Sequence, residues 1–147
     1  MARFRFRLQT LLHYRQHLVE QSEQAVARLS AEEQALLEQI HHCRAELNSR
    51  ADHGAGMKAH QLQLQDAYRQ QLADRVRLLE RQLDAVRSER QREQERLVER
   101  MQACDVLERL RERRLQEHAY TERRDEQNQL DDIATRQRRA RSSANGL

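Results

Sequence analysis

Histidine is the residue type in this chain with the most direct route to metal chemistry. His13 and His17 are four residues apart, so on a helix they would share one face and could hold a divalent ion. No glutamate stands between them in the zinc-protease arrangement, and no third ligand lies close by. His41 and His42 are adjacent and would diverge by about 100° on a helix. The spacing favours solvated helix histidines, so the sequence predicts neither a metal site nor a cofactor.

Catalytic and phosphate-binding motifs are absent from the sequence. There is no glycine-rich loop ending in Gly-Lys-Ser/Thr, and the Gly-Ala-Gly at 54–56 is typical of a turn. Aromatic residues make up only 3% of the chain and tryptophan is absent, which leaves little material for a pocket. We therefore predict a protein that is not an enzyme and has no small-molecule substrate.

Two clusters of closely spaced arginines could contact phosphates: Arg109, Arg111, Arg113 and Arg114, and Arg136, Arg138, Arg139 and Arg141. Glu108 and Glu112 dilute the first cluster, which favours a solvated or protein-facing surface. For the second cluster, phosphate contact and a solvated surface both stay open. Bases would find few stacking partners, because Tyr120 is the one aromatic residue nearby.

The composition is that of long helices or of disorder. Charged residues make up 35% of the 147 residues, the net charge is +3, and both signs are mixed along most of the chain. No apolar run is long enough to span a bilayer, and the basic N-terminus lacks the apolar region of a signal peptide. The sequence therefore predicts a cytoplasmic chain.

The turn signal lies at Gly54 and Gly56, two of only three glycines in a chain without proline. We predict a single all-α domain, an antiparallel two-helix coiled-coil hairpin with a longer second helix. The expected bounds are 8–49 for the first helix, 50–57 for the turn, 58–138 for the second helix and 139–147 for a disordered tail.

Apolar residues alternate at spacings of three and four, which is typical of a coiled coil. The seam of the first helix follows two series, Leu12, Val19, Val26, Glu33, Ile40, Leu47 and Leu8, Arg15, Ser22, Leu29, Leu36, Cys43. The seam of the second helix follows Leu72, Val76, Leu79, Leu83, Val86, Arg90, Glu93 and Leu97.

Folding the helices about Ala55 predicts a register. Glu33 would lie near Arg77, and the first helix would run out opposite about residue 105. Cys43 and Cys104 would be roughly 55 Å apart at ~1.5 Å per residue, which excludes a disulfide between them. The rest of the second helix would lack an intrachain mate, and we expect a partner to order it.

Two segments resemble the FliJ family of flagellar type III export proteins. One is the opening Phe4-Arg5-Phe6-Arg7-Leu8-Gln9-Thr10-Leu11-Leu12, followed by Arg15, and the other is Glu126-Gln127-Asn128-Gln129-Leu130-Asp131-Asp132-Ile133-Ala134. The length and the glycines near residue 55 agree as well. Asn128 and Gln129 stand where the family commonly has basic residues.

The resemblance implies a non-enzymatic stalk, similar to that of rotary ATPases, in the central pore of the hexameric export ATPase. It also implies contacts with the cytoplasmic domain of the membrane export gate and with export chaperones, peripherally at the inner membrane. The ATPase-facing residues would then be Phe4, Phe6, Leu8, Leu107, Leu110, Leu130 and Ile133. The gate-facing residues near the turn would be Leu47, Tyr68 and Leu72.

A basic coiled-coil adaptor that binds nucleic acid or another scaffold is the alternative. It predicts binding with a steep dependence on salt. A leucine-zipper DNA binder is disfavoured, because the glycine break turns the seam back within one chain.

Overall fold

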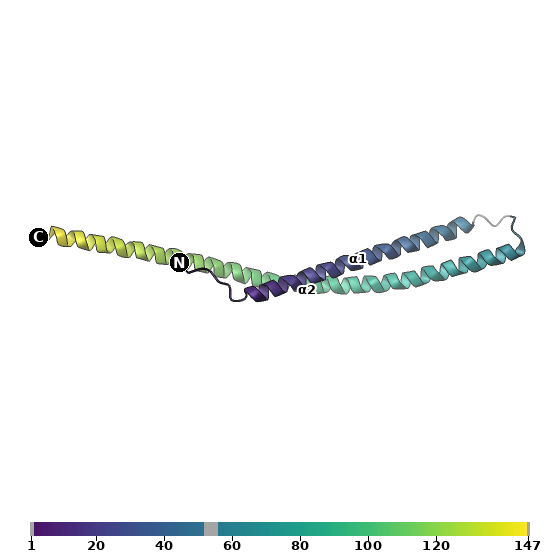
Figure 1. Ribbon diagram of the computed structural model, residues 1–147, viewed down its shortest axis with the longest axis horizontal. Helices are drawn as coiled ribbons and strands as arrows, with labels where there is room; N and C mark the ends of the chain where they lie inside the picture. Colours follow the sequence, from purple (N-terminus) through teal and green to yellow (C-terminus); the bar gives the residue numbers. More distant parts are fainter. Residues whose placement is uncertain (1, 52–55, 147) are drawn as a thin grey trace. The chain divides into compact units, whose positions relative to one another are not determined.

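The chain folds into two long α-helices, α1 (Gln9–Ala51) and α2 (Ala59–Asn145), with α2 the longer (Figure 1). The computed structural model describes residues 2–51 and 56–146, with side chains for all of these except 50 and 51. No strand occurs in this described part, so the prediction of an all-α pair of packed helices is confirmed. Neither helix has, over the same residues, a stretch long and apolar enough to cross a bilayer.

The start of α2 follows from glycine and capping chemistry. The predicted turn falls partly on residues 52–55, which lie outside the described residues. Gly56 has a φ of 96°, a left-handed conformation that glycine adopts at little cost. Lys58 then acts as the N-cap, because its carbonyl accepts from Leu62 N (3.1 Å) and its own N–H donates to Gln61 Oε1 (3.3 Å).

The end of α2 differs from the predicted boundary. Residues 139–145 are helical, although the sequence suggested a disordered tail over 139–147. Arginine and alanine favour the helix, and residues 139–145 contain no glycine or proline that would end it. All described residues from 123 onward are exposed, so this part of the helix is held by its own backbone hydrogen bonds.

The chain divides into two compact units, each containing a segment of α1 and a segment of α2. One unit comprises residues 17–101, and the other comprises residues 1–16 and 102–147. We describe each unit by itself.

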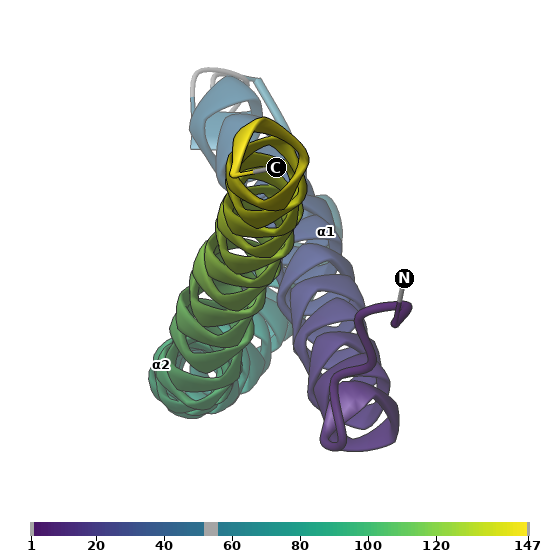
Figure 2. The same cartoon turned by 90° about the vertical axis from the view of Figure 1, so that its left-hand side faces the viewer.

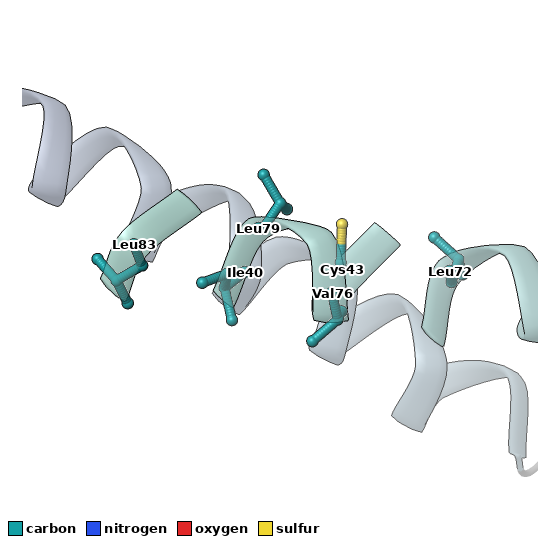
Figure 3. Close-up of a cluster of buried hydrophobic side chains, with 6 residues drawn as sticks. All are labelled: Ile40, Cys43, Leu72, Val76, Leu79 and Leu83. Carbon is teal, nitrogen blue, oxygen red and sulfur yellow. The ribbon is translucent and has the colours of Figure 1, made fainter. Parts of the chain in front are cut away.

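The 17–101 unit is built around an apolar cluster drawn in Figure 3. Ile40 and Cys43 of α1 pack with four residues of α2: Leu72, Val76, Leu79 and Leu83. All of these residues belong to the predicted seams, and the partly buried Leu36, Leu37, Leu47 and Tyr68 pack around them. The heptad pattern therefore places the core correctly on both helices.

Some seam positions are occupied by buried polar residues instead of apolar ones. Glu33 is buried and accepts from Arg87 Nε (3.1 Å) and from Arg90 Nη1. Ser22, also buried, accepts from Arg100 Nη1 (2.7 Å). These charge-assisted bonds satisfy groups that would be costly to bury alone.

The predicted register about Ala55 is wrong. Glu33 faces Arg87 and Arg90 rather than Arg77, a displacement of about three helical turns along α2. The reason lies at the start of α2, where Leu62 and Leu64 are exposed and the first buried seam residue is Leu72. The helices do not pack directly from the turn, and the seam itself sets their alignment.

We expect Ile40→Val to lower the free energy of unfolding by about 1 kcal/mol, because it removes one buried methylene from the cluster. Urea unfolding followed by circular dichroism measures the change. Leu78→Ala is the matched control, since Leu78 is 54% exposed and should shift stability by less than about 0.5 kcal/mol. Equal effects of both variants would contradict the assigned seam.

Candidate partner-binding ends

The unit formed by residues 1–16 and 102–147 holds the chain start against α2. We call residues 2–8 the N-terminal arm; it contains no helix or strand and leads into the first turn of α1 (Figure 2). The Phe4 ring meets the His118 ring edge-on, with centroids 5.6 Å apart and an interplanar angle of 61°. At the start of α1, Arg111 Nε donates to Gln9 Oε1 at 3.0 Å. The arm therefore follows α2 from about residue 111 to residue 118.

Two hollows of opposite charge flank the arm. The acidic one, of about 450 Å³, is lined by Ala2, His118, Thr121, Glu122, Asp125, Glu126 and Gln129. The basic one, of about 460 Å³, is lined by Arg5, Phe6, Arg7, Leu8 and Arg114. The arm therefore contributes residues to one acidic hollow and to one basic hollow.

The residues predicted to face an ATPase fall into three groups. Leu107 is only 9% exposed and Leu110 is half-buried, so both are seam residues and do not form a free apolar surface. Phe4 and Phe6 are half-buried in the arm, and Leu8 is 39% exposed. The expectation that α2 lacks intrachain cover from about residue 105 is corrected, because the arm and the later register cover it to about His118.

The exposed part of α2 begins further along the chain. We call residues 123–145 the distal segment; each of its residues is exposed. Leu130 and Ile133 lie here, 60% and 51% exposed. They are three residues apart and share one helix face. Of the predicted ATPase-facing set, these two offer the most accessible apolar surface.

The residues predicted to face the gate are mostly committed to intrachain packing. Leu72 is buried, and Leu47 and Tyr68 pack against the apolar cluster. Tyr68 also donates from its hydroxyl to Glu46 Oε2 at 3.2 Å. The structure instead exposes three apolar residues that the sequence reading missed: Met57, Leu62 and Leu64. Their exposure could have been predicted for Leu62 and Leu64, because these residues are two apart, which does not fit the three–four spacing, and because they precede the heptad seam.

His13 and His17 each lie on α1, one helical turn from a glutamine. Gln9 Nε2 donates to His13 Nε2 at 2.9 Å, and Gln21 Nε2 donates to His17 Nε2 at 3.2 Å. Across the parts of the chain with described positions, no three metal-ligating side chains gather at one point.

Cys104 lies in the seam of the same unit as the arm. Both cysteines are free thiols. Burial raises the pKa of the Cys104 thiol, and the negative charge of Glu108, whose Oε1 accepts from Sγ at 3.6 Å, raises this pKa further. Asp105 acts in the same direction. The thiol form is therefore favoured at neutral pH.

We expect the pH at which Cys104 is half-maximally alkylated by iodoacetamide to lie above that of the urea-unfolded chain. A raised pKa leaves less thiolate at any pH below it, and only the thiolate reacts. Peptide mass spectrometry separates Cys104 from Cys43. Glu108→Gln should move the folded-state value downward, and a folded-state value at or below the unfolded one would contradict the assignment.

Comparison with known protein families gives one match for the chain. The model of the flagellar FliJ protein family matches residues 4–143. No curated protein and no solved structure matches significantly. The match includes residues 4–8 of the arm and residues 123–143 of the distal segment.

Proposed function

Because this chain belongs to the FliJ family, whose members are non-enzymatic components of flagellar protein export, we propose that it is the stalk of the export ATPase. In this role it inserts in the ATPase hexamer, promotes hexamer assembly and ATP hydrolysis, and links the hexamer to the membrane export gate and to export chaperones. The protein would then act in the cytoplasm, peripherally at the inner membrane of the flagellar base.

The distal segment carries this proposal. It extends α2 through residues 123–145 with every residue exposed, and it presents Leu130 and Ile133 on one face. A helix without tertiary packing is marginal in water, so a partner that encloses it gains the free energy of burying these side chains. An enclosing ring of subunits would provide that cover on all sides of a single helix.

The distal segment also carries charges of both signs on its surface. Asp125, Glu126, Asp131 and Asp132 precede Arg136, Arg138, Arg139 and Arg141. Mixed charges can meet complementary groups on a surrounding protein, and they lower the free energy gained from any single fixed contact. For the gate contact near the turn, the exposed Met57, Leu62 and Leu64 supplement the half-buried Leu47 and Tyr68.

The test is ATP hydrolysis by the export ATPase of the same organism, titrated with this protein while hexamer formation is followed by light scattering. We expect hydrolysis to rise and to saturate at about one chain per hexamer. Absence of both binding and stimulation would reject the stalk. Salt-sensitive binding to nucleic acid in its place would favour the basic adaptor, through the exposed arginines of the distal segment.

A further inference from the structure

The basic hollow brings together arginines from two distant parts of the sequence. Arg5 and Arg7 belong to the N-terminal arm, whereas Arg114 belongs to α2. The contacts of Phe4 with His118 and of Gln9 with Arg111 bracket Arg114 and hold the arm beside it. Three arginines therefore line one concave site of about 460 Å³.

None of the three arginines takes part in a salt bridge within the described residues. No acidic residue precedes Glu20 in the sequence, and the exposed Glu117, one helical turn beyond Arg114, forms no ion pair with it. Three like charges in one hollow repel one another, so an anion bound between them would relieve that repulsion.

The start of α1 adds to the positive potential of the hollow. Leu8 lines the hollow and directly precedes Gln9, the first residue of α1. The first turn of α1 contains no acidic residue that would neutralise the positive end of the helix dipole. The arginines remain the main source of attraction, because the dipole contributes only about half a unit charge.

We propose that this hollow binds a phosphate group carrying more than one negative charge. Arginine forks match phosphate oxygens with paired hydrogen bonds, and three of them suit a di- or triphosphate better than a single carboxylate. Phe6 and Leu8 supply an apolar wall for the organic part of such a ligand. Nucleoside polyphosphates and lipid headgroups with a phosphomonoester share this chemistry.

The first experiment titrates the full chain alone with pyrophosphate in low salt by isothermal calorimetry. The triple variant Arg5→Gln/Arg7→Gln/Arg114→Gln should bind at least about tenfold more weakly, because three charge-assisted contacts are lost. The matched control Arg136→Gln/Arg138→Gln/Arg139→Gln removes the same charge from the exposed distal segment and should change the dissociation constant by less than about twofold.

A second variant guards against loss of the arm structure. Arg5→Lys/Arg7→Lys/Arg114→Lys keeps the charge but removes the paired geometry, and its binding should fall between that of the wild type and that of the glutamine variant. Hydrogen exchange of residues 9–14 reports whether the start of α1 stays folded in each variant. Equal weakening by the hollow and distal variants, or lysine binding as strong as arginine binding, would overturn the site.

Two further experiments identify the source of the phosphate group. ATP binding that depends on the three arginines would indicate a free nucleotide. Sedimentation with vesicles that contain phosphatidic acid, whose phosphomonoester can carry two negative charges, would indicate a lipid headgroup if it shows the same dependence and neither pyrophosphate nor ATP binds. If none of these experiments shows binding that depends on the three arginines, the proposal is overturned. None of these assays contains the ATPase, so their outcome is independent of the stalk proposal.

Discussion

Changing Leu130 and Ile133 to aspartate should abolish stimulation of the export ATPase while leaving the helicity of the chain near the wild-type value. Both side chains are more than half exposed, so the folded chain alone loses little from the change. Inside an enclosing partner, two carboxylates would be desolvated without a counter-ion, which is costly. ATP hydrolysis at saturating stalk concentration and far-ultraviolet circular dichroism measure the two effects.

The matched control for this variant is Leu78→Asp. Leu78 is 54% exposed on α2 but belongs to the 17–101 unit. It adds the same type of charge at similar exposure and should leave stimulation unchanged. If the Leu130/Ile133 variant stimulates hydrolysis as the wild type does, the distal segment is not part of the interface.

The second large effect should follow from Glu33→Ala, which we expect to lower the free energy of unfolding by about 3 kcal/mol. Glu33 is 7% exposed and is the partner of both Arg87 and Arg90. Removing it leaves two arginines without their counter-charge, one of which already has its Nε buried without a hydrogen bond. Urea unfolding of the isolated chain measures the loss.

Glu33→Leu separates charge from packing at the same position. Leucine fills the seam between neighbouring heptad positions, and the arginines, 48% and 34% exposed, can turn towards water. This variant should recover most of the stability lost in Glu33→Ala. Cysteine crosslinking in this variant between positions 44 and 80, whose native side chains pair across the two helices, would then show whether the helices keep their alignment without the Glu33 ion pairs. A stability loss as large as that of alanine would show that the arginines cannot be released.

The sequence predicted the helices and their seams because the heptad pattern is local. Ile40, Cys43, Leu72 and Val76 could be assigned to the core from spacing alone, and the structure buries all four. The register could not be obtained in this way. It depends on how far α2 runs before it meets α1, and the pairing of Glu33 with Arg87 and Arg90 fixes it across more than fifty residues.

The exposure of the residues at the two ends could be predicted only in part, for the same reason. Leu130 and Ile133 are exposed as expected. Leu107 was expected beyond the part of the second helix that the first helix covers, but the observed register buries it in the seam. The contact of the arm with His118 depends on the tertiary fold, and no local pattern in the sequence predicts it.

The polar seam has a calorimetric consequence. Only ten apolar side chains are buried among the residues with described side chains, and Glu33 and Ser22 occupy seam positions between them. The heat capacity change of unfolding grows with exposed apolar area and falls with exposed polar area. Per residue, it should therefore lie well below the roughly 12–15 cal/mol/K of globular domains. The free energy of unfolding of this protein should then curve only gently with temperature.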